Sequence, residues 1–242
     1  MRKNKNNLSE NSLSLDLSTA DGDRLYRYSP QVIDSMRNMA SRLMRTGKLP
    51  ECLGFIAALQ QEGVTYLSRA WGLTIANDLQ INVCIVELNW WRPDKMLTAG
   101  KSSPGLAALL QSKAKLQEAL VATNYPNLSL IPAGQLNFLE RPIQARGEAL
   151  KTLITGLRQQ FDHVVLDIPA IRATTDAQPL AFLPESVCLV VQQGVTTVEN
   201  ARLALDAIGH LPIAGVVLNR YRTSTPDWVL RLIPQDATVF SG

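Results

Sequence analysis

Six short apolar runs, separated by stretches with helical spacing of apolar residues, constrain the fold of this chain more than any other feature. Two of them, VCIVEL at 83–88 and VCLVV at 187–191, are apolar on both faces of a strand, so helices must cover both sides of the sheet. Right-handed crossovers between parallel strands give that arrangement. We therefore predict an α/β protein, with a doubly wound, mostly parallel sheet and helices on both faces. The predicted strands are Leu53–Leu59, Asn82–Leu88, Leu128–Pro132, His163–Ile168, Ser186–Gln192 and Ile213–Asn219.

Length and composition limit the class of protein. The 242 residues suit one domain with at most a long extension, and 46% hydrophobic with 19% charged residues is typical of a soluble globular protein. The net charge of +3 is too small an excess to predict nucleic-acid binding. The longest apolar run is far shorter than the roughly 20 residues that cross a bilayer, and the polar amino terminus has no signal-peptide core. A cytoplasmic protein is expected.

The amino-terminal residues differ in composition from the rest of the chain. Residues 1–28 are rich in Asn, Ser and charge, and their leucines are too sparse to form a core face. We predict that they form a flexible arm. A helical pattern begins at Ser29 and Pro30, with Ser29 as the cap and Pro30 in the first turn.

The first predicted strand runs through Gln60, Gln61 and Glu62 into a helix, the layout of a phosphate-binding loop. A working loop reads G-x-x-x-x-G-K-[ST], in which the lysine reaches the outer phosphates and the hydroxyl binds Mg²⁺. Gly63 and Thr65 match this pattern, but Val64 stands where the lysine belongs and Ala58 where the first glycine belongs. By itself, the segment also fits an ordinary strand-to-helix turn.

Polar residues lie at the carboxyl ends of three other predicted strands, where ligands bind in a doubly wound fold. Asp167 follows three apolar residues and could contact a nucleotide's Mg²⁺ shell. Glu87 could position a nucleophile or a metal-bound water. The amide of Asn219, beside Arg220, could bind a base edge. Each residue also fits an ordinary role as a cap, a solvated strand end or a turn residue.

Trp90 and Trp91 are adjacent just after a predicted strand. Two neighbouring indoles cannot both face the core easily, so at least one is expected at the surface as a contact residue. The alternative is a ring packed under the following loop.

Taken in order, these segments resemble the P-loop ATPase domain of the bacterial tyrosine kinases that govern capsule and exopolysaccharide assembly. These kinases belong with the deviant-Walker ATPases, which include the Min and Par partitioning proteins. The resemblance covers about residues 29–223 and implies a P-loop NTPase-like fold with ATP and Mg²⁺ as ligands. The matching segments are 60–66 (PGEGKST-like), 87–93 (DADLRRP-like), 132–134, 161–169 (FDYVIIDTPP-like), 175–177 (TDA) and 215–220.

The resemblance also assigns site residues. It implies Asp167 and Glu87 as catalytic residues, and Thr65 with Asp167 as Mg²⁺ ligands. The nucleotide-binding residues that it implies are Glu62, Gly63, Thr65, Arg92, Asn219 and Arg220.

The sequence differs from the family pattern mainly at the residues that would take part in phosphate binding and catalysis. Val64 replaces the phosphate-binding lysine, Gln61 replaces a loop glycine, and Glu87-Leu88-Asn89 replaces Asp-x-Asp. The family's E-x2-R-x2-R ring-assembly motif reads Asp34-x2-Arg37-x2-Ala40. Residues 224–242 form a short carboxyl-terminal extension without the family's tyrosine cluster. Because phosphoryl transfer depends on positioning and electrostatics, a lost phosphate contact typically costs several kcal/mol of transition-state stabilisation.

Three functions follow from this pattern, and the sequence leaves open whether the chain is an enzyme. The favoured one is a degenerate, pseudo-ATPase regulatory or scaffold subunit of exopolysaccharide biosynthesis and export. Its expected partner is a membrane polysaccharide co-polymerase or related export component, contacted through Trp90 or Trp91 in a homo- or hetero-oligomer at the inner face of the membrane. The second is an active ATP-dependent autokinase in which Arg92 or Arg220 replaces the lysine. The third, a partitioning-type DNA-associated ATPase, needs a coherent basic face, and the basic residues here are scattered.

Overall fold

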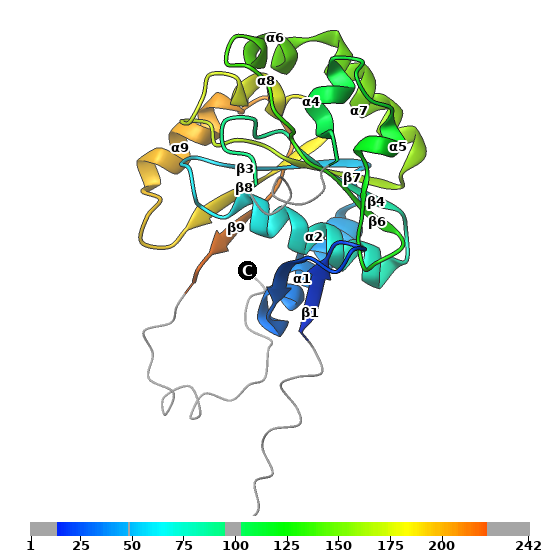
Figure 1. The fold of residues 1–242 in the computed structure, drawn as a ribbon. Coiled ribbons are helices and arrows are strands. Elements are labelled where there is room, and N and C mark those ends of the chain that lie inside the picture. Colours follow the sequence, from blue (N-terminus) through cyan, green and yellow to red (C-terminus); the bar gives the residue numbers. More distant parts are fainter. Residues whose placement is uncertain (1–13, 48, 95–102, 222–242) are drawn as a thin grey trace, which may run out of the picture.

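The computed structural model describes residues 14–47, 49–94 and 103–221 and has a seven-stranded sheet at its centre (Figure 1). The strand order is β5-β6-β4-β7-β3-β8-β9, and all neighbours are parallel except β5 and β6. The predicted mostly parallel α/β sheet is therefore confirmed. The strands are β3 (Cys52–Ala57), β4 (Val83–Glu87), β5 (Val121–Ala122), β6 (Leu128–Ile131), β7 (His163–Asp167), β8 (Ser186–Gln192) and β9 (Ile213–Asn219).

Helices cover both faces of this sheet (Figure 1). On one face α1 and α2 enclose an apolar core, and on the other face the later helices enclose a second one. Helix α7 buries one apolar stripe of Leu150, Ile154 and Leu157, whereas α2 is buried all round from Leu67 to Ala76. The helices are α1 (Pro30–Thr46), α2 (Val64–Leu79), α4 (Gly105–Leu110), α5 (Leu116–Ala119), α6 (Glu140–Arg146), α7 (Glu148–Gln160), α8 (Ala177–Ala181) and α9 (Val198–Ala207).

Helix α2, which follows β3, packs closely against β4 of the sheet. A Cβ at Gly72 of α2 would be 2.5 Å from Cδ1 of Ile85 on β4, so only glycine fits there. Trp71 is fully buried beside it, and its indole Nε1 donates to Nε2 of His163 at 2.8 Å. This contact ties α2 to the start of β7 and thereby orients the amino end of α2 at the carboxyl edge of the sheet.

The prediction of a flexible arm over residues 1–28 is wrong for residues 15–28. They form an antiparallel hairpin of β1 (Leu15–Ser18) and β2 (Arg24–Tyr28). The hairpin buries Leu17, Leu25 and Tyr28 against the α1 and α2 side of the molecule. The few apolar residues were too sparse to predict a core face, but they fall together once the strands pair. Residues 1–13 and the predicted extension 224–242 lie outside the described residues.

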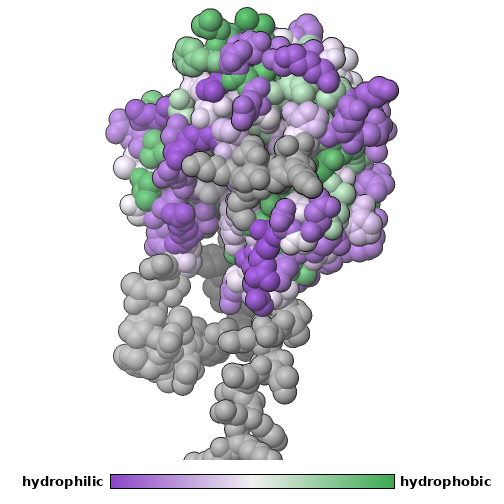
Figure 2. Space-filling view, viewed as in Figure 1, coloured by the Kyte–Doolittle hydropathy of each residue, from purple (hydrophilic) through white to green (hydrophobic). Residues whose placement is uncertain are grey.

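None of the helices in the described ranges is long and apolar enough to cross a membrane. Exposed apolar side chains do occur at the start of α6, where Phe138, Leu139 and Ile143 are among the most exposed large hydrophobic residues. Figure 2 shows them as a green area at the top of the molecule.

Candidate functional site

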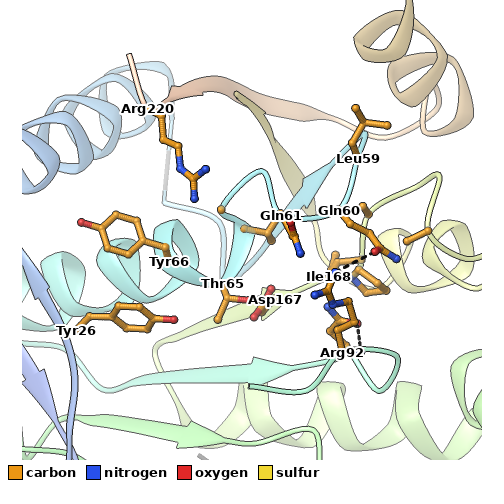
Figure 3. Close-up of a pocket in the computed structure, with 16 residues that line it drawn as sticks. Tyr26, Leu59, Gln60, Gln61, Thr65, Tyr66, Arg92, Asp167, Ile168 and Arg220 are labelled. Carbon is orange, nitrogen blue, oxygen red and sulfur yellow. Dashed lines mark hydrogen bonds between the residues drawn. The ribbon is translucent and has the colours of Figure 1, made fainter. Parts of the chain in front are cut away.

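A cavity of about 390 Å³ lies at the carboxyl ends of β3, β4 and β7, where the fold predicts a ligand (Figure 3). It is lined from several elements that are distant in sequence, including the loop after β3, the start of α2 and the ends of β7 and β9. Of the residues predicted from the sequence for the site, those that line it are Gly63, Thr65, Arg92, Asp167 and Arg220.

The loop between β3 and α2 has the backbone of an anion-binding turn. Gly63 caps α2 in the left-handed region (φ 96°), and a Cβ there would lie 2.0 Å from Nδ2 of Asn219. That Nδ2 donates to the carbonyl of Glu62 at 2.8 Å, and the backbone N–H of Arg220 donates to Oδ1 of Asn219 at 2.8 Å. Asn219 holds the loop and lines a neighbouring cavity of about 740 Å³ rather than this one, so its predicted contact with a base edge stays a prediction.

Glu62 was predicted to contact the nucleotide, and the structure contradicts this. Its side chain is fully buried on the far side of the loop. Oε2 accepts from the backbone N–H of Leu59 at 2.9 Å, and Oε1 accepts from the hydroxyl of Thr196. Both carboxylate oxygens therefore stabilise the turn, and neither faces the ligand.

The amino end of α2 opens into the cavity, and its backbone N–H groups and dipole favour an anion there. Val64 is the first residue of the helix and lines the cavity, and it offers a phosphate neither charge nor hydrogen bond. No lysine lines the cavity among the residues that the structure describes.

Two arginines supply the positive charge of the cavity (Figure 3). The side chain of Arg220 points inward from the end of β9. Arg92 lies on the opposite side, where its Nη1 donates to Oε1 of Gln60 at 3.3 Å. With the amide of Gln61 turned to present its oxygen, that oxygen accepts from Nη1 and Nη2 of Arg92 at 2.9 Å. Arg92 is thus tied to the loop, whereas Arg220 is directed at the open space.

Asp167, at the end of β7, is the buried acidic group of the cavity. Its side chain is almost completely buried, and within the described residues neither carboxylate oxygen has a hydrogen-bond partner. Burial raises its pKa to about 7, and the neighbouring charge of Glu87 adds to the increase. The nearby Thr65 hydroxyl lowers this pKa, and no N–H of the described residues donates to the carboxylate, so its oxygens can accept a ligand atom from the cavity.

Glu87 was predicted as a second catalytic acid, and the structure contradicts this as well. It pairs in register with Asp167 on the neighbouring strand, but it does not line the cavity. Its Oε1 accepts from the backbone N–H of Asp94 at 2.6 Å, and its Oε2 accepts from that of Ala133 at 3.1 Å. Burial raises the pKa of Glu87. Both oxygens hold neighbouring loops, and the side chain is buried away from the cavity.

Proteins of similar sequence show what this chain is related to. The chain is 24% identical over 213 residues to the succinoglycan biosynthesis transport protein ExoP of Rhizobium meliloti strain 1021, which covers 80% of this chain and 26% of ExoP. It is 27% identical over 124 residues to the tyrosine-protein kinase CpsD of Streptococcus agalactiae, which covers 50% of this chain and 53% of CpsD. Its homologues are the bacterial tyrosine kinases and ExoP. No protein-family model matches the sequence. The chain spans about a quarter of ExoP and about half of CpsD.

Solved structures confirm the fold of this kinase homologue. The kinase domain of the Escherichia coli tyrosine kinase ETK superposes with a TM-score of 0.69 at 19% identity, covering 80% of this chain and 79% of that one. MinD of Pyrococcus horikoshii, complexed with Mg-ADP, superposes with a TM-score of 0.57 at 20% identity, covering 76% and 78%. The predicted P-loop NTPase-like fold and the predicted resemblance are both confirmed.

The residues of the kinase homologue fit a divalent cation beside Asp167. Thr65 lies next to that carboxylate (Figure 3), and a hydroxyl with an unpaired carboxylate suits Mg²⁺, which takes its other ligands from water and phosphate. Among the described residues, no group of three or more His, Cys, Asp or Glu side chains could hold a metal alone. When bound, such a cation neutralises phosphate charge.

The two adjacent tryptophans, Trp90 and Trp91, differ in burial. Trp90 is buried, and its Nε1 donates to the carbonyl of Ala133 at 2.9 Å, so the predicted partner contact is wrong for Trp90. The indole packs under the loop that follows β6, because a buried N–H needs an acceptor and finds one there. Trp91 is half-buried against the same core, and its partner contact stays a prediction.

Sequence reasoning missed two residues of the site. Tyr26 lines the cavity from β2, which was predicted to be flexible, and Figure 3 shows its hydroxyl directed toward Thr65 and Asp167. Arg69 of α2 is almost completely buried, forms an ion pair with Asp94, and lies 5.4 Å from the Tyr26 ring centroid. An arginine on the buried face of an otherwise apolar helix was the one available signal for this cluster.

Proposed function

We propose that this kinase homologue is a regulatory or scaffold subunit of bacterial exopolysaccharide biosynthesis and export, with a nucleotide site that has lost phosphoryl transfer. The similarity to ExoP and to the tyrosine-protein kinases supports the pathway. One observation supports the loss of chemistry: Val64 occupies the amino end of α2, where a P-loop has its lysine.

The arrangement of charges supports the proposed loss of phosphoryl transfer. Phosphoryl transfer relies on charges already in place around the γ-phosphate. Here Glu62 and Glu87 are committed to loop contacts, and the cations sit at the rim on Arg92 and Arg220 rather than at the helix end. The cavity can attract an anion, but the negative charge that develops on the γ-phosphate during transfer is not stabilised at the helix end.

The proposed partner is a membrane polysaccharide co-polymerase or a related export component, and the complex is a homo- or hetero-oligomer. ExoP is named a biosynthesis transport protein, which supports this class of partner. The subunit would then act in the cytoplasm, at the inner face of the membrane, through the partner. Trp91 is the proposed contact because its indole is only half-buried.

A second candidate function is an active ATPase or autokinase. The inward-pointing Arg220 and the unpaired Asp167 beside Thr65 favour it, since together they offer a phosphate contact and a Mg²⁺ ligand set. In this case an arginine at the rim of the cavity contacts the phosphate in place of the missing lysine.

Isothermal titration with ATP and Mg²⁺ separates the two functions. The regulatory function predicts binding weaker than millimolar and no phosphate release, because Val64 cannot contact a phosphate. Micromolar binding or steady phosphate release that Asp167→Ala abolishes would establish the enzyme instead.

A further inference from the structure

The cluster around Arg69 is not explained by either candidate function. Arg69 lies in α2, one turn after Thr65, with only 2% of its side chain exposed. Its guanidinium pairs with the Asp94 carboxylate, and the Tyr26 ring lies 5.4 Å from it. A buried cation of this kind is retained only with close partners, since an unpaired buried charge is strongly unfavourable.

Asp94 belongs to the connection that leaves β4, and residues 88–94 are its described part before residue 95. The Asp94 carboxylate contacts Arg69, and its backbone N–H donates to Oε1 of Glu87 at 2.6 Å. Glu87 is itself fixed by the N–H of Ala133 at 3.1 Å. Asp94 is therefore bound on two sides, to α2 by an ion pair and to β4 by a hydrogen bond.

Arg92 lies two residues before Asp94. Its backbone N–H donates to Oδ1 of Asn89 at 3.1 Å, and its guanidinium reaches Gln60 and Gln61 of the phosphate-binding turn. Segment 88–94 is held at Leu88, whose N–H donates to the carbonyl of Asp167 at 2.9 Å, and at Asp94, and Arg92 lines the cavity between these two points.

We propose that Arg69 is a positioning residue: through Asp94 it holds loop 88–94 so that Arg92 faces the cavity as a contact for a polyphosphate anion. The proposal concerns the placement of Arg92 and holds for a regulatory and for a catalytic chain alike. Tyr26 shields the Arg69 guanidinium from water, which explains why the hairpin docks beside the cavity. Glu87 has the same positioning role from the β4 side.

Hydrogen exchange of the full chain tests the positioning. We expect Arg69→Met to speed exchange of the backbone amides in segment 88–94 by about tenfold, with β3, β4 and β7 unchanged. Arg69→Lys, which keeps the charge, should restore most of the protection. Arg37→Met is the control, because Arg37 also pairs with an aspartate, Asp78 near the end of α2, and neither residue lines the cavity.

Two results would overturn the positioning role. Exchange in segment 88–94 within twofold of wild type would show that Arg69 does not hold the loop. A uniform increase through the three central strands would show a general contribution to stability only. Should Arg69→Met fail to fold, Asp94→Asn removes the ion pair while keeping a polar side chain of the same size, and it is judged by the same criteria.

Pyrophosphate titration tests the anion contact. Arg92→Met and Arg69→Met should each weaken pyrophosphate binding about fivefold, and the double variant should bind no more weakly than either single one, because both changes remove the same contact. Wild-type protein that does not bind pyrophosphate, or additive losses in the double variant, would contradict the contact. Neither result bears on phosphoryl transfer, which the titration with ATP decides.

Discussion

At the amino end of α2, a single side chain sets how the cavity meets an anion. Val64 lies among groups that are otherwise suited to a phosphate: the helix end, the hydroxyl of Thr65 and the left-handed turn at Gly63. The turn itself is kept in shape by Asn219 and Glu62, neither of which depends on a ligand. The backbone therefore keeps the geometry of a phosphate-binding loop, while the lysine charge at the start of α2 is missing.

Restoring the charge should restore binding. We expect Val64→Lys to tighten ATP binding at least about tenfold, because a charged hydrogen bond to a phosphate is gained where the turn already has the right shape. Isothermal titration measures the change, and Val64→Met serves as the control of similar length. Equal binding by the Lys and Met variants would show that the loop has lost its nucleotide geometry.

At the scale of elements, α2 and β7 are joined by a buried polar pair. The Nε1–H of Trp71 donates to Nε2 of His163, so the His163 proton lies on Nδ1, which donates to the carbonyl of Pro50 at 2.7 Å. Burial lowers the pKa of His163 from 6.5 to about 4. The folded chain thus keeps this imidazole neutral where the unfolded chain protonates it.

This pair predicts a pH dependence of stability. As pH falls from 6.5 toward 4, the unfolded state binds a proton at His163 that the folded state does not, so the His163 contribution to the free energy of unfolding should decrease by about 3 kcal/mol. Asp167, whose pKa is raised to about 7, acts in the opposite direction, so the comparison with a His163 variant isolates this contribution. Urea unfolding at pH 7 and pH 4.5 measures this. His163→Gln keeps a donor and an acceptor but does not titrate, so its loss over the same range should be smaller. An equal loss in both proteins would assign the effect to other groups.

At the scale of the whole molecule, four of the five tyrosines lie in the hairpin, in α2 and just after β9, and the fifth, Tyr125, lies between β5 and β6. Tyr26, Tyr28 and Tyr66 form a packed aromatic cluster, with ring centroids 4.8–5.8 Å apart, and Tyr221 is exposed. We expect no autophosphorylation when the purified chain is incubated with Mg-ATP, because the site lacks its lysine. Phosphate found by mass spectrometry on any of these four tyrosines, and absent from an Asp167→Ala control, would refute this.

The docking of a partner is the second prediction at this scale. Trp91→Ala should reduce capture of a co-expressed co-polymerase while the melting temperature stays near wild type, since interface tryptophans often contribute about 2 kcal/mol or more. Trp90→Ala is the structural control. It removes core packing and the hydrogen bond to the carbonyl of Ala133, so we expect it to destabilise the fold by about 3–5 kcal/mol. Normal capture by a stable Trp91→Ala variant would rule out the contact.

The period of the apolar residues is enough to predict the central strands and the longer helices. The predicted strand Asn82–Leu88 is β4 (Val83–Glu87), and the helix predicted from Pro30 begins there. Such patterns are local, because a strand or helix shows its buried face within a few residues. The hairpin was missed because its apolar residues share a face only after β1 and β2 pair.

The order of motifs by itself determined the fold family and the place of the cavity, because a strand, a tight turn and a helix follow one another along the chain. Only the tertiary structure decided what each polar residue does there. The Glu62 carboxylate is used by Thr196, 134 residues away, and that of Glu87 by Ala133, 46 residues away. Spacing along a chain contains no record of such partners. An acid at a strand end therefore looks the same in sequence whether it lines a cavity, as Asp167 does, or its oxygens bind the backbone of another loop.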